Sequence, residues 1–253
     1  LEHFDGRRWS QSNFTQQAAA PSWSKRGEVL RYSVVMQPSS QRWLFALDVA
    51  RSEEGGVQAR RDFSLQYQRP IDQPLRYQVR SWPDVLRDAN VPLSSLADSL
   101  QLPAEGDPRS RAWARELQAR HPQPDALVQA LLQHFNREPY HYTLKPPPVG
   151  IDSIDEFLFR TRRGFCAHYA GAMTFVLRAA GIPARVVAGY QGGELNPAGN
   201  YLSVRQFDAH AWVEYWQDGK GWISVDPTFQ VAPERIELGL EQALAEEQSF
   251  LEE

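Results

Sequence analysis

Hydrophobic residues in the first third of the chain form short runs that are rich in β-branched and aromatic side chains and partly alternate with polar ones. These runs lie at residues 29–36, 43–49, 57–68 and 75–80. Turn-forming segments such as Pro38-Ser39-Ser40 separate them. Short runs of this kind between turn residues are typical of antiparallel strands with one solvent-exposed face. The pattern predicts a β-rich N-terminal subdomain over residues 1–83, which contains no grouping of residues that indicates catalysis.

The middle of the chain changes to a helical period. Apolar residues recur every three or four positions between Pro124 and Phe135, which predicts an amphipathic helix. A preceding helix is expected to begin at Asp107-Pro108, because Asp is a favoured N-cap residue and Pro is tolerated at the first helical position. We therefore interpret residues 84–138 as a helical connector.

From residue 139 onward, the pattern predicts helices followed by an antiparallel sheet. The longest helix is expected to begin at Cys166 and to end at Gly181. A helix followed by neighbouring antiparallel strands indicates the α+β class rather than a doubly wound sheet. We assign residues 139–232 to one core domain and residues 233–253 to a C-terminal helical extension. Strands are predicted at residues 139–144, 184–191, 201–205, 209–216 and 221–225.

Composition excludes several classes of protein. The chain has 253 residues, of which 42% are hydrophobic and 23% are charged, so it has enough material for a folded core and is neither disordered nor fibrous. The net charge of −4 provides no basic field for a nucleic-acid partner. No apolar run approaches the roughly 18 residues that a membrane-spanning helix requires.

The single cysteine, Cys166, excludes an internal disulfide and a cysteine-rich metal site. Histidines and carboxylates also lack metal-binding spacing, so we expect no metal ion and no cofactor. Cys166 lies at the predicted start of a helix, where unpaired backbone N–H groups and the helix dipole favour an anion. Gly164 allows the backbone to turn sharply just before it. Position alone is equally compatible with a reactive thiol and with an inert buried cysteine.

Two further residues favour the reactive thiol. His210 lies on a predicted strand 44 residues after Cys166, and Asp226 follows 16 residues later on the next strand. A hairpin turn near Asp218-Gly219 brings His210 within one or two rungs of Asp226. The turn type decides whether the two side chains share a face, and the sequence leaves that open. The spacing allows a carboxylate to orient an imidazole that faces a thiol.

Four segments of the chain carry a resemblance to a known family. In this order and at this spacing, they resemble the motifs of the transglutaminase-like core, and the match spans residues 140–230. The chain as a whole is similar to the bacterial members that carry this core between transmembrane helices. The four segments are Arg163-Gly164-Phe165-Cys166-Ala167-His168-Tyr169-Ala170, Ala180-Gly181-Ile182-Pro183-Ala184-Arg185-Val186-Val187-Ala188-Gly189-Tyr190, Asp208-Ala209-His210-Ala211-Trp212-Val213-Glu214 and Asp226-Pro227-Thr228.

The resemblance implies a papain-like α+β fold, in which the helix that bears Cys166 packs on an antiparallel sheet. It also implies roles for three residues: Cys166 as the nucleophile, His210 as the base and then the acid, and Asp226 as the residue that orients His210. The family has a further oxyanion donor upstream of the cysteine. Tyr140 or Tyr142 is the candidate for that donor in this chain.

The function implied by the resemblance is that of a protein-glutamine γ-glutamyltransferase, which passes the acyl group of a glutamine through a thioester to a primary amine. The expected partners are a protein or peptide that offers the glutamine and a primary amine acceptor, with no nucleic acid. Similar proteins place this domain in the periplasm and tether it to the inner membrane by flanking transmembrane helices. Two alternatives stay open: a papain-like protease or amidase acting on envelope peptides, and a catalytically idle domain that binds peptide or docks a partner.

Other residues near the motifs receive a structural interpretation. His168 is two helical positions after Cys166, where side chains diverge by about 200°, so we interpret it as structural or as support for the site. Trp212, Trp216 and Trp222 are candidates for excluding water from the thioester. Packing on the sheet is the interpretation that we favour for these three aromatic side chains.

Overall fold

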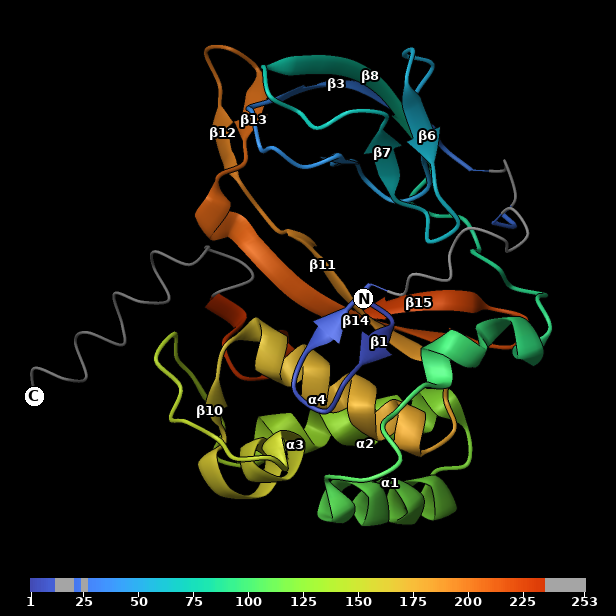
Figure 1. Cartoon of the computed structure of the whole chain (residues 1–253), viewed down its shortest axis with the longest axis vertical. Helices are drawn as coiled ribbons and strands as arrows, with labels where there is room; N and C mark the ends of the chain where they lie inside the picture. Colours follow the sequence, from blue (N-terminus) through green and yellow to red (C-terminus); the bar gives the residue numbers. More distant parts are fainter. Residues whose placement is uncertain (12–20, 24–26, 235–253) are drawn as a thin grey trace, which may run out of the picture. The chain divides into compact units, whose positions relative to one another are not determined.

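The computed structural model describes residues 1–11, 21–23 and 27–234. The predicted helical extension over 233–253 therefore lies, from residue 235 on, outside the described residues. The chain forms two compact units, each with its own hydrophobic core (Figure 1). One unit comprises Leu1–Ser12, Leu93–Gln217 and Ile223–Glu253, and the other comprises Asn13–Pro92 and Asp218–Trp222. The domain boundaries predicted at residues 83, 138 and 232 stay a prediction.

The smaller unit is built from two three-stranded antiparallel sheets, as the alternating pattern predicts. The strand order is β3-β8-β5 in the first sheet and β4-β7-β6 in the second. Tyr77 is buried between them in the core of this unit, where its hydroxyl donates to the Phe45 carbonyl at 2.7 Å. The strands are β3 (Leu30–Met36), β4 (Trp43–Leu44), β5 (Ala50–Arg51), β6 (Val57–Ala59), β7 (Leu65–Tyr67) and β8 (Leu75–Ser81).

One predicted strand of this unit is divided in two. The run at 57–68 folds into β6 and β7, which pair with each other. Phe63 adopts a left-handed conformation with φ of 68°, and the Arg60 N–H donates to the Ser64 carbonyl at 2.8 Å. A bulky residue with positive φ is uncommon, so the alternation of the run did not indicate this turn.

The larger unit contains the helices. The buried Asp155 carboxylate accepts hydrogen bonds from the backbone N–H groups of Arg109 and Ser110 at the start of α1. Asp107, the predicted cap of α1, instead accepts from the Ile154 and Asp155 N–H groups at the start of α3. The two carboxylates thus cap each other's helix. The helical elements are η1 (Leu93–Leu100), α1 (Pro108–Arg120), α2 (Pro124–Arg137), α3 (Ser153–Glu156), η2 (Phe157–Thr161), α4 (Cys166–Ala179), η3 (Gln206–Asp208) and η4 (Pro227–Gln230).

The principal sheet of the larger unit has the order β11-β14-β15, and α4 packs against β14 (Figure 1). The α+β class is therefore confirmed. Shorter pairs complete the unit: β1 with β2, β12 with β13, and β9, which runs parallel to β10. The strands are β1 (His3–Phe4), β2 (Trp9–Ser10), β9 (His141–Tyr142), β10 (Arg163–Gly164), β11 (Ala184–Tyr190), β12 (Glu194–Asn196), β13 (Tyr201–Ser203), β14 (Ala209–Gln217) and β15 (Gly221–Val225).

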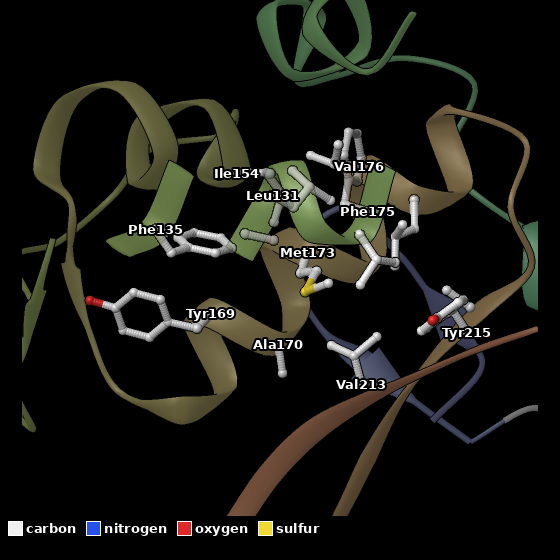
Figure 2. Packing of buried hydrophobic residues seen from close by; sticks show 14 of the residues in the cluster. Leu131, Phe135, Ile154, Tyr169, Ala170, Met173, Phe175, Val176, Val213 and Tyr215 are labelled. Atoms are coloured by element: carbon white, nitrogen blue, oxygen red, sulfur yellow. The ribbon is translucent and has the colours of Figure 1, made fainter. Parts of the chain in front are cut away.

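Helix α4 is buried almost all round, which explains why its sequence is apolar on more than one face. Met173 lies at its centre with no exposed surface. Figure 2 shows its neighbours: Leu131 and Phe135 come from α2, and Val213 comes from β14. Because interiors are packed as densely as organic crystals, a helix enclosed in this way has little room to shift. Its first residue is therefore held in place by the core.

Candidate active site

Cys166 is the first residue of α4, as the sequence predicts. The preceding Phe165 has extended backbone, with φ of −110° and ψ of −179°, so the chain turns abruptly from β10 into the helix. β10 is held on its other side by β9, where Gly164 pairs with Tyr142. The side chain of Cys166 is buried, with 8% of the residue exposed. The backbone N–H groups of this first helical turn are positioned to bind an anion next to the thiol.

His210 is the second residue of β14 and is 3% exposed. Its Nε2 lies 2.6 Å from Oδ2 of Asp226. The other oxygen of the same carboxylate accepts the Thr228 N–H at 2.9 Å, because Asp226 is the N-cap of η4. The hairpin therefore places both side chains on one face, which the sequence had left open.

The other ring nitrogen of His210, Nδ1, has different surroundings from Nε2. Nδ1 is buried and has no nitrogen or oxygen partner among the described residues. Burial by itself lowers the pKa of His210, but the hydrogen bond that its Nε2–H donates to Asp226 and the interaction with Cys166 outweigh burial and raise the pKa from 6.5 to about 9. The protonated form of the imidazole is thus favoured by the carboxylate and by the thiol group.

Trp212 lies beside the imidazole, a placement that the sequence analysis did not assign. Its ring is nearly parallel to that of His210, at 19° and with 6.3 Å between the ring centroids. Gly189 pairs with His210 across the ladder, and a Cβ there would come within 2.7 Å of Cη2 of Trp212. The glycine therefore provides the space that the indole occupies. Trp216 and Trp222 are buried, in keeping with the packing role that we favour for them.

The two tyrosines named as oxyanion candidates lie in different surroundings. Tyr140 is in the core, where its hydroxyl donates to the Leu158 carbonyl at 2.9 Å and lies 3.1 Å from Nε2 of His134. Its hydroxyl is therefore committed to the core. Tyr142 is partly buried on β9 and pairs with Gly164, two residues before Cys166. Of the two, Tyr142 is the candidate that the fold brings to the nucleophile.

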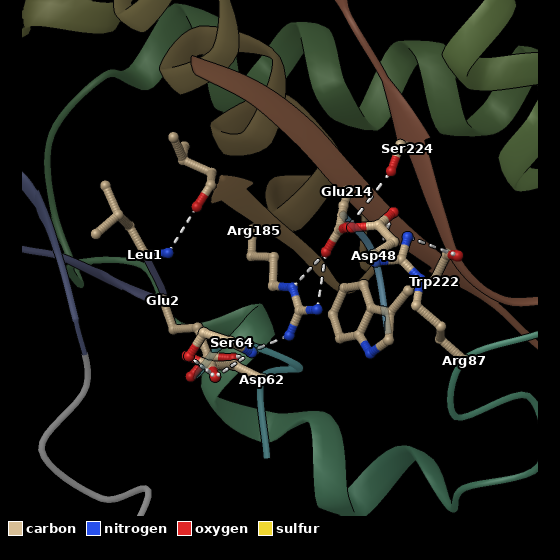
Figure 3. A network of polar contacts seen from close by, with 11 residues as sticks. Leu1, Glu2, Asp48, Asp62, Ser64, Arg87, Arg185, Glu214, Trp222 and Ser224 are labelled. Atoms are coloured by element: carbon tan, nitrogen blue, oxygen red, sulfur yellow. Dashed lines mark hydrogen bonds and ion pairs between the residues drawn. The ribbon is translucent and has the colours of Figure 1, made fainter. Parts of the chain in front are cut away.

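A buried ion pair joins β11 to β14, the strand that also contains His210 (Figure 3). Arg185 of β11 and Glu214 of β14 are paired in register, and Nε and Nη2 of Arg185 each lie 2.8 Å from Oε2 of Glu214. The Ser224 hydroxyl donates to the other Glu214 oxygen at 3.3 Å. Glu2 lies near Nη1 of Arg185, at 3.7 Å. This network fixes the register of the strands that carry the imidazole.

In the part of the chain that the structure describes, no group of three or more His, Cys, Asp or Glu side chains is arranged to hold a metal ion. Among the same residues, no helix is both long and apolar enough to cross a membrane.

Residues 111–227 match the model of the transglutaminase-like superfamily, and residues 1–88 match that of the TgpA N-terminal domain. The crystal structure of the periplasmic domain of TgpA from Pseudomonas aeruginosa is 64% identical in sequence. Its TM-score with this chain is 0.90, over 96% of this chain and 84% of that one. This chain belongs to the TgpA-type transglutaminase-like family. The resemblance of its motifs to that family is thereby confirmed.

Relatives of this TgpA-type chain include longer proteins. A protein-glutamine gamma-glutamyltransferase of Pseudomonas aeruginosa is 63% identical over 251 residues, which cover 99% of this chain and 38% of that protein. The uncharacterized protein YebA of Bacillus subtilis is 35% identical over 136 residues, or 51% of this chain and 18% of that protein. The chain thus spans well under half the length of the curated relatives that it matches.

Proposed function

We propose that Cys166, His210 and Asp226 form a catalytic triad and that the chain transfers the γ-glutamyl group of protein-bound glutamine to primary amines. The observation that carries the proposal is the placement of His210, with Asp226 2.6 Å from one ring nitrogen and the other nitrogen available to Cys166 at a helix start. The name of the 63%-identical Pseudomonas protein supports the reaction type. The periplasmic origin of the solved relative supports a periplasmic location.

The first half of the reaction forms a thioester. His210 accepts the thiol proton of Cys166 on Nδ1, and the thiolate attacks the carboxamide carbon of a glutamine side chain. The backbone N–H of Cys166 donates to the oxyanion of the tetrahedral intermediate, and we propose Tyr142 as the second donor. When the intermediate collapses, the C–N bond breaks and His210 gives its proton to the departing ammonia.

The second half of the reaction transfers the acyl group. An amine, such as a lysine side chain, attacks the thioester carbonyl while His210 accepts a proton from it. The C–S bond breaks, an isopeptide bond forms and Cys166 recovers its proton. Asp226 keeps Nδ1 facing the thiol throughout and stabilises the imidazolium that forms twice in each cycle.

An assay that measures both products tests this proposal. The protein is incubated with a glutamine-containing donor protein such as casein and a fluorescent primary amine as the acceptor, beside Cys166→Ala, and both amine incorporation and ammonia release are followed. We expect incorporation by the wild type and none by the variant, because the thioester cannot form without the thiol. Ammonia release or peptide cleavage without incorporation would instead indicate the amidase or protease alternative. If neither product forms, the chain is better explained as a catalytically idle domain that binds peptide or docks a partner.

The glycine beside the imidazole gives a second prediction. Because a Cβ at residue 189 overlaps the Trp212 ring, Gly189→Ala displaces the indole from beside His210. We expect kcat for amine incorporation to fall about 10- to 100-fold, because a small displacement of the groups around a catalytic residue can cost up to about 100-fold. The double variant Gly189→Ala/Trp212→Phe relieves the overlap with a smaller ring and should recover part of the loss. If the single and double variants are equally slow, displacement of Trp212 is not the cause.

A further inference from the structure

The turn that presents Cys166 is held by a histidine that the reaction above does not use. His168 is the third residue of α4, and its Nδ1 accepts a hydrogen bond from the Phe165 N–H at 3.3 Å. In return, the His168 N–H donates to the Phe165 carbonyl at 2.8 Å. Both backbone polar groups of the residue before the nucleophile are thus bonded to His168.

The ring of His168 is fixed on several sides. It meets the Phe165 ring edge to face, with 4.4 Å between centroids, and lies 5.7 Å from the Phe157 ring. It also lies over Gly164, where a Cβ would come within 2.7 Å of its Cγ. Gly164 therefore leaves the space that the ring occupies. A ring held in this way has one orientation, with Nδ1 toward the Phe165 N–H.

This arrangement is one half of a helix capping box, because the side chain at the third helical position accepts the N-cap N–H, whereas Phe165 has no side-chain acceptor and its carbonyl bonds the His168 N–H instead. The side chain that accepts the N-cap N–H at the third helical position is ordinarily Glu or Gln. A Glu at this position would bring a negative charge to the helix end where a thiolate and an oxyanion form, and a like charge there disfavours both. Burial lowers the pKa of His168, so the ring is neutral near pH 7 and offers an acceptor without adding charge.

We propose that His168 is a positioning residue for the nucleophile: it caps the turn before Cys166 with a neutral acceptor and so holds the thiol in place without opposing its ionisation. The inference rests on the proposed role of Cys166 as nucleophile. It gives a specific form to the supporting role that the sequence analysis assigned to His168. Residues 166 and 168 point in different directions on a helix, but the ring folds back onto the peptide that precedes the cysteine.

Three variants of His168 distinguish the contributions of its hydrogen bond, its lack of charge and its ring to the reactivity of the Cys166 thiol. His168→Gln keeps a neutral acceptor, His168→Glu keeps an acceptor but adds a negative charge, and His168→Phe keeps a ring without an acceptor. The readout is the second-order rate of alkylation by iodoacetamide between pH 5 and 9. Because Cys166 is the only cysteine, all alkylation of a thiol reports on it. Melting temperature is measured beside it, together with kcat and KM for amine incorporation.

We expect His168→Gln to alkylate within about threefold of the wild type. His168→Phe should be about five- to tenfold slower, the effect of one lost hydrogen bond on the position of the thiol. His168→Glu should melt at least as high as the Gln variant yet alkylate about tenfold more slowly near neutral pH, because the added charge raises the cost of forming the thiolate. In the Phe and Glu variants kcat should fall with the alkylation rate while KM changes little.

His134→Phe is the matched control. This variant replaces another partly buried histidine, whose ring forms a hydrogen bond with the Tyr140 hydroxyl and packs against Trp113 in the core. It should lower the melting temperature without changing the alkylation rate of Cys166. Equal alkylation rates for the Gln and Glu variants would overturn the inference, as would a loss in all three variants that only follows their melting temperatures. If the wild type alkylates rapidly but incorporates no amine, the proposed function fails while the alkylation comparison still decides the role of His168.

Discussion

Asp226→Asn lowers kcat for amine incorporation by about 10³- to 10⁴-fold, the loss expected when the carboxylate that orients a catalytic histidine becomes an amide. Oδ2 of Asp226 lies 2.6 Å from Nε2 of His210, and Oδ1 is tied to the Thr228 N–H. Because the Thr228 N–H keeps the amide oxygen of the variant at the Oδ1 position, its NH2 group faces Nε2 and can neither accept the Nε2 proton nor stabilise the imidazolium. Steady-state kinetics with the fluorescent amine measures the effect.

The same variant has a signature in its pH dependence. Asp226 is a principal cause of the raised pKa of His210, which is about 9 instead of 6.5. The wild-type rate should therefore fall near pH 9, and in Asp226→Asn this alkaline limb should move toward neutral pH. A folded-state pKa above the unfolded value stabilises the fold fully below pH 6.5, and this contribution is lost as the pH rises through 9. Urea unfolding should therefore show a decline in stability over this interval that is shallower in the variant.

Asp218→Asn is the control for this prediction, because it removes a carboxylate that is exposed in the hairpin turn. It should leave kcat and the pH profile unchanged. A wild-type kcat in Asp226→Asn, or an alkaline limb that stays near pH 9, would contradict the assignment of Asp226 as the orienting residue.

Glu214→Leu destabilises the larger unit by about 3–5 kcal/mol, because it leaves the Arg185 guanidinium buried and without its main partner. The side chains of Arg185 and Glu214 are 7% and 4% exposed, so water cannot replace the lost ion pair. For a chain of this size the loss corresponds to a fall in melting temperature of about 10 °C. Thermal unfolding followed by circular dichroism measures it.

The double variant Arg185→Met/Glu214→Leu tests the cause. Replacing both partners by apolar residues of similar volume is often neutral or stabilising, so the double variant should melt well above Glu214→Leu. Because Arg185 and Glu214 pair in register on the strands that carry Gly189 and His210, the single variant should also lose amine incorporation at temperatures where it begins to unfold. If the double variant is no more stable than the single one, the unpaired guanidinium is not the source of the loss.

Local signals in the sequence determined where the elements lie around the nucleophile. Gly164 before the turn and the apolar run after Cys166 predict a helix that begins at the cysteine, and α4 begins there. The Asp218-Gly219 turn predicts a hairpin, and β14 and β15 flank it. These features depend on neighbouring residues, whose conformational preferences act over a few positions. The family and the three candidate catalytic residues came from a further feature of the sequence, the resemblance of its four motifs to the transglutaminase-like core.

The tertiary structure decided which side chains meet. A shift of one residue in strand register reverses every face, so only the folded sheet places Nε2 of His210 on Asp226 and the indole of Trp212 over Gly189. Likewise, the parallel pairing of β9 with β10 brings Tyr142 to the nucleophile, while core packing takes Tyr140 away from it.

Helix capping and ion pairing also show which features the sequence predicts and which only the tertiary structure determines. From the sequence, Asp107 caps its own helix, and His168 diverges from Cys166 as a structural or supporting residue whose contacts are not specified. In the structure, Asp107 caps α3, and His168 bonds the peptide that precedes the nucleophile. Arg185 and Glu214 are 29 residues apart and became partners only through the pairing of β11 with β14. The sequence alone therefore determined the elements and the candidate residues they carry, whereas long-range contacts, which local preferences do not encode, determined which of those side chains lie together in the folded chain.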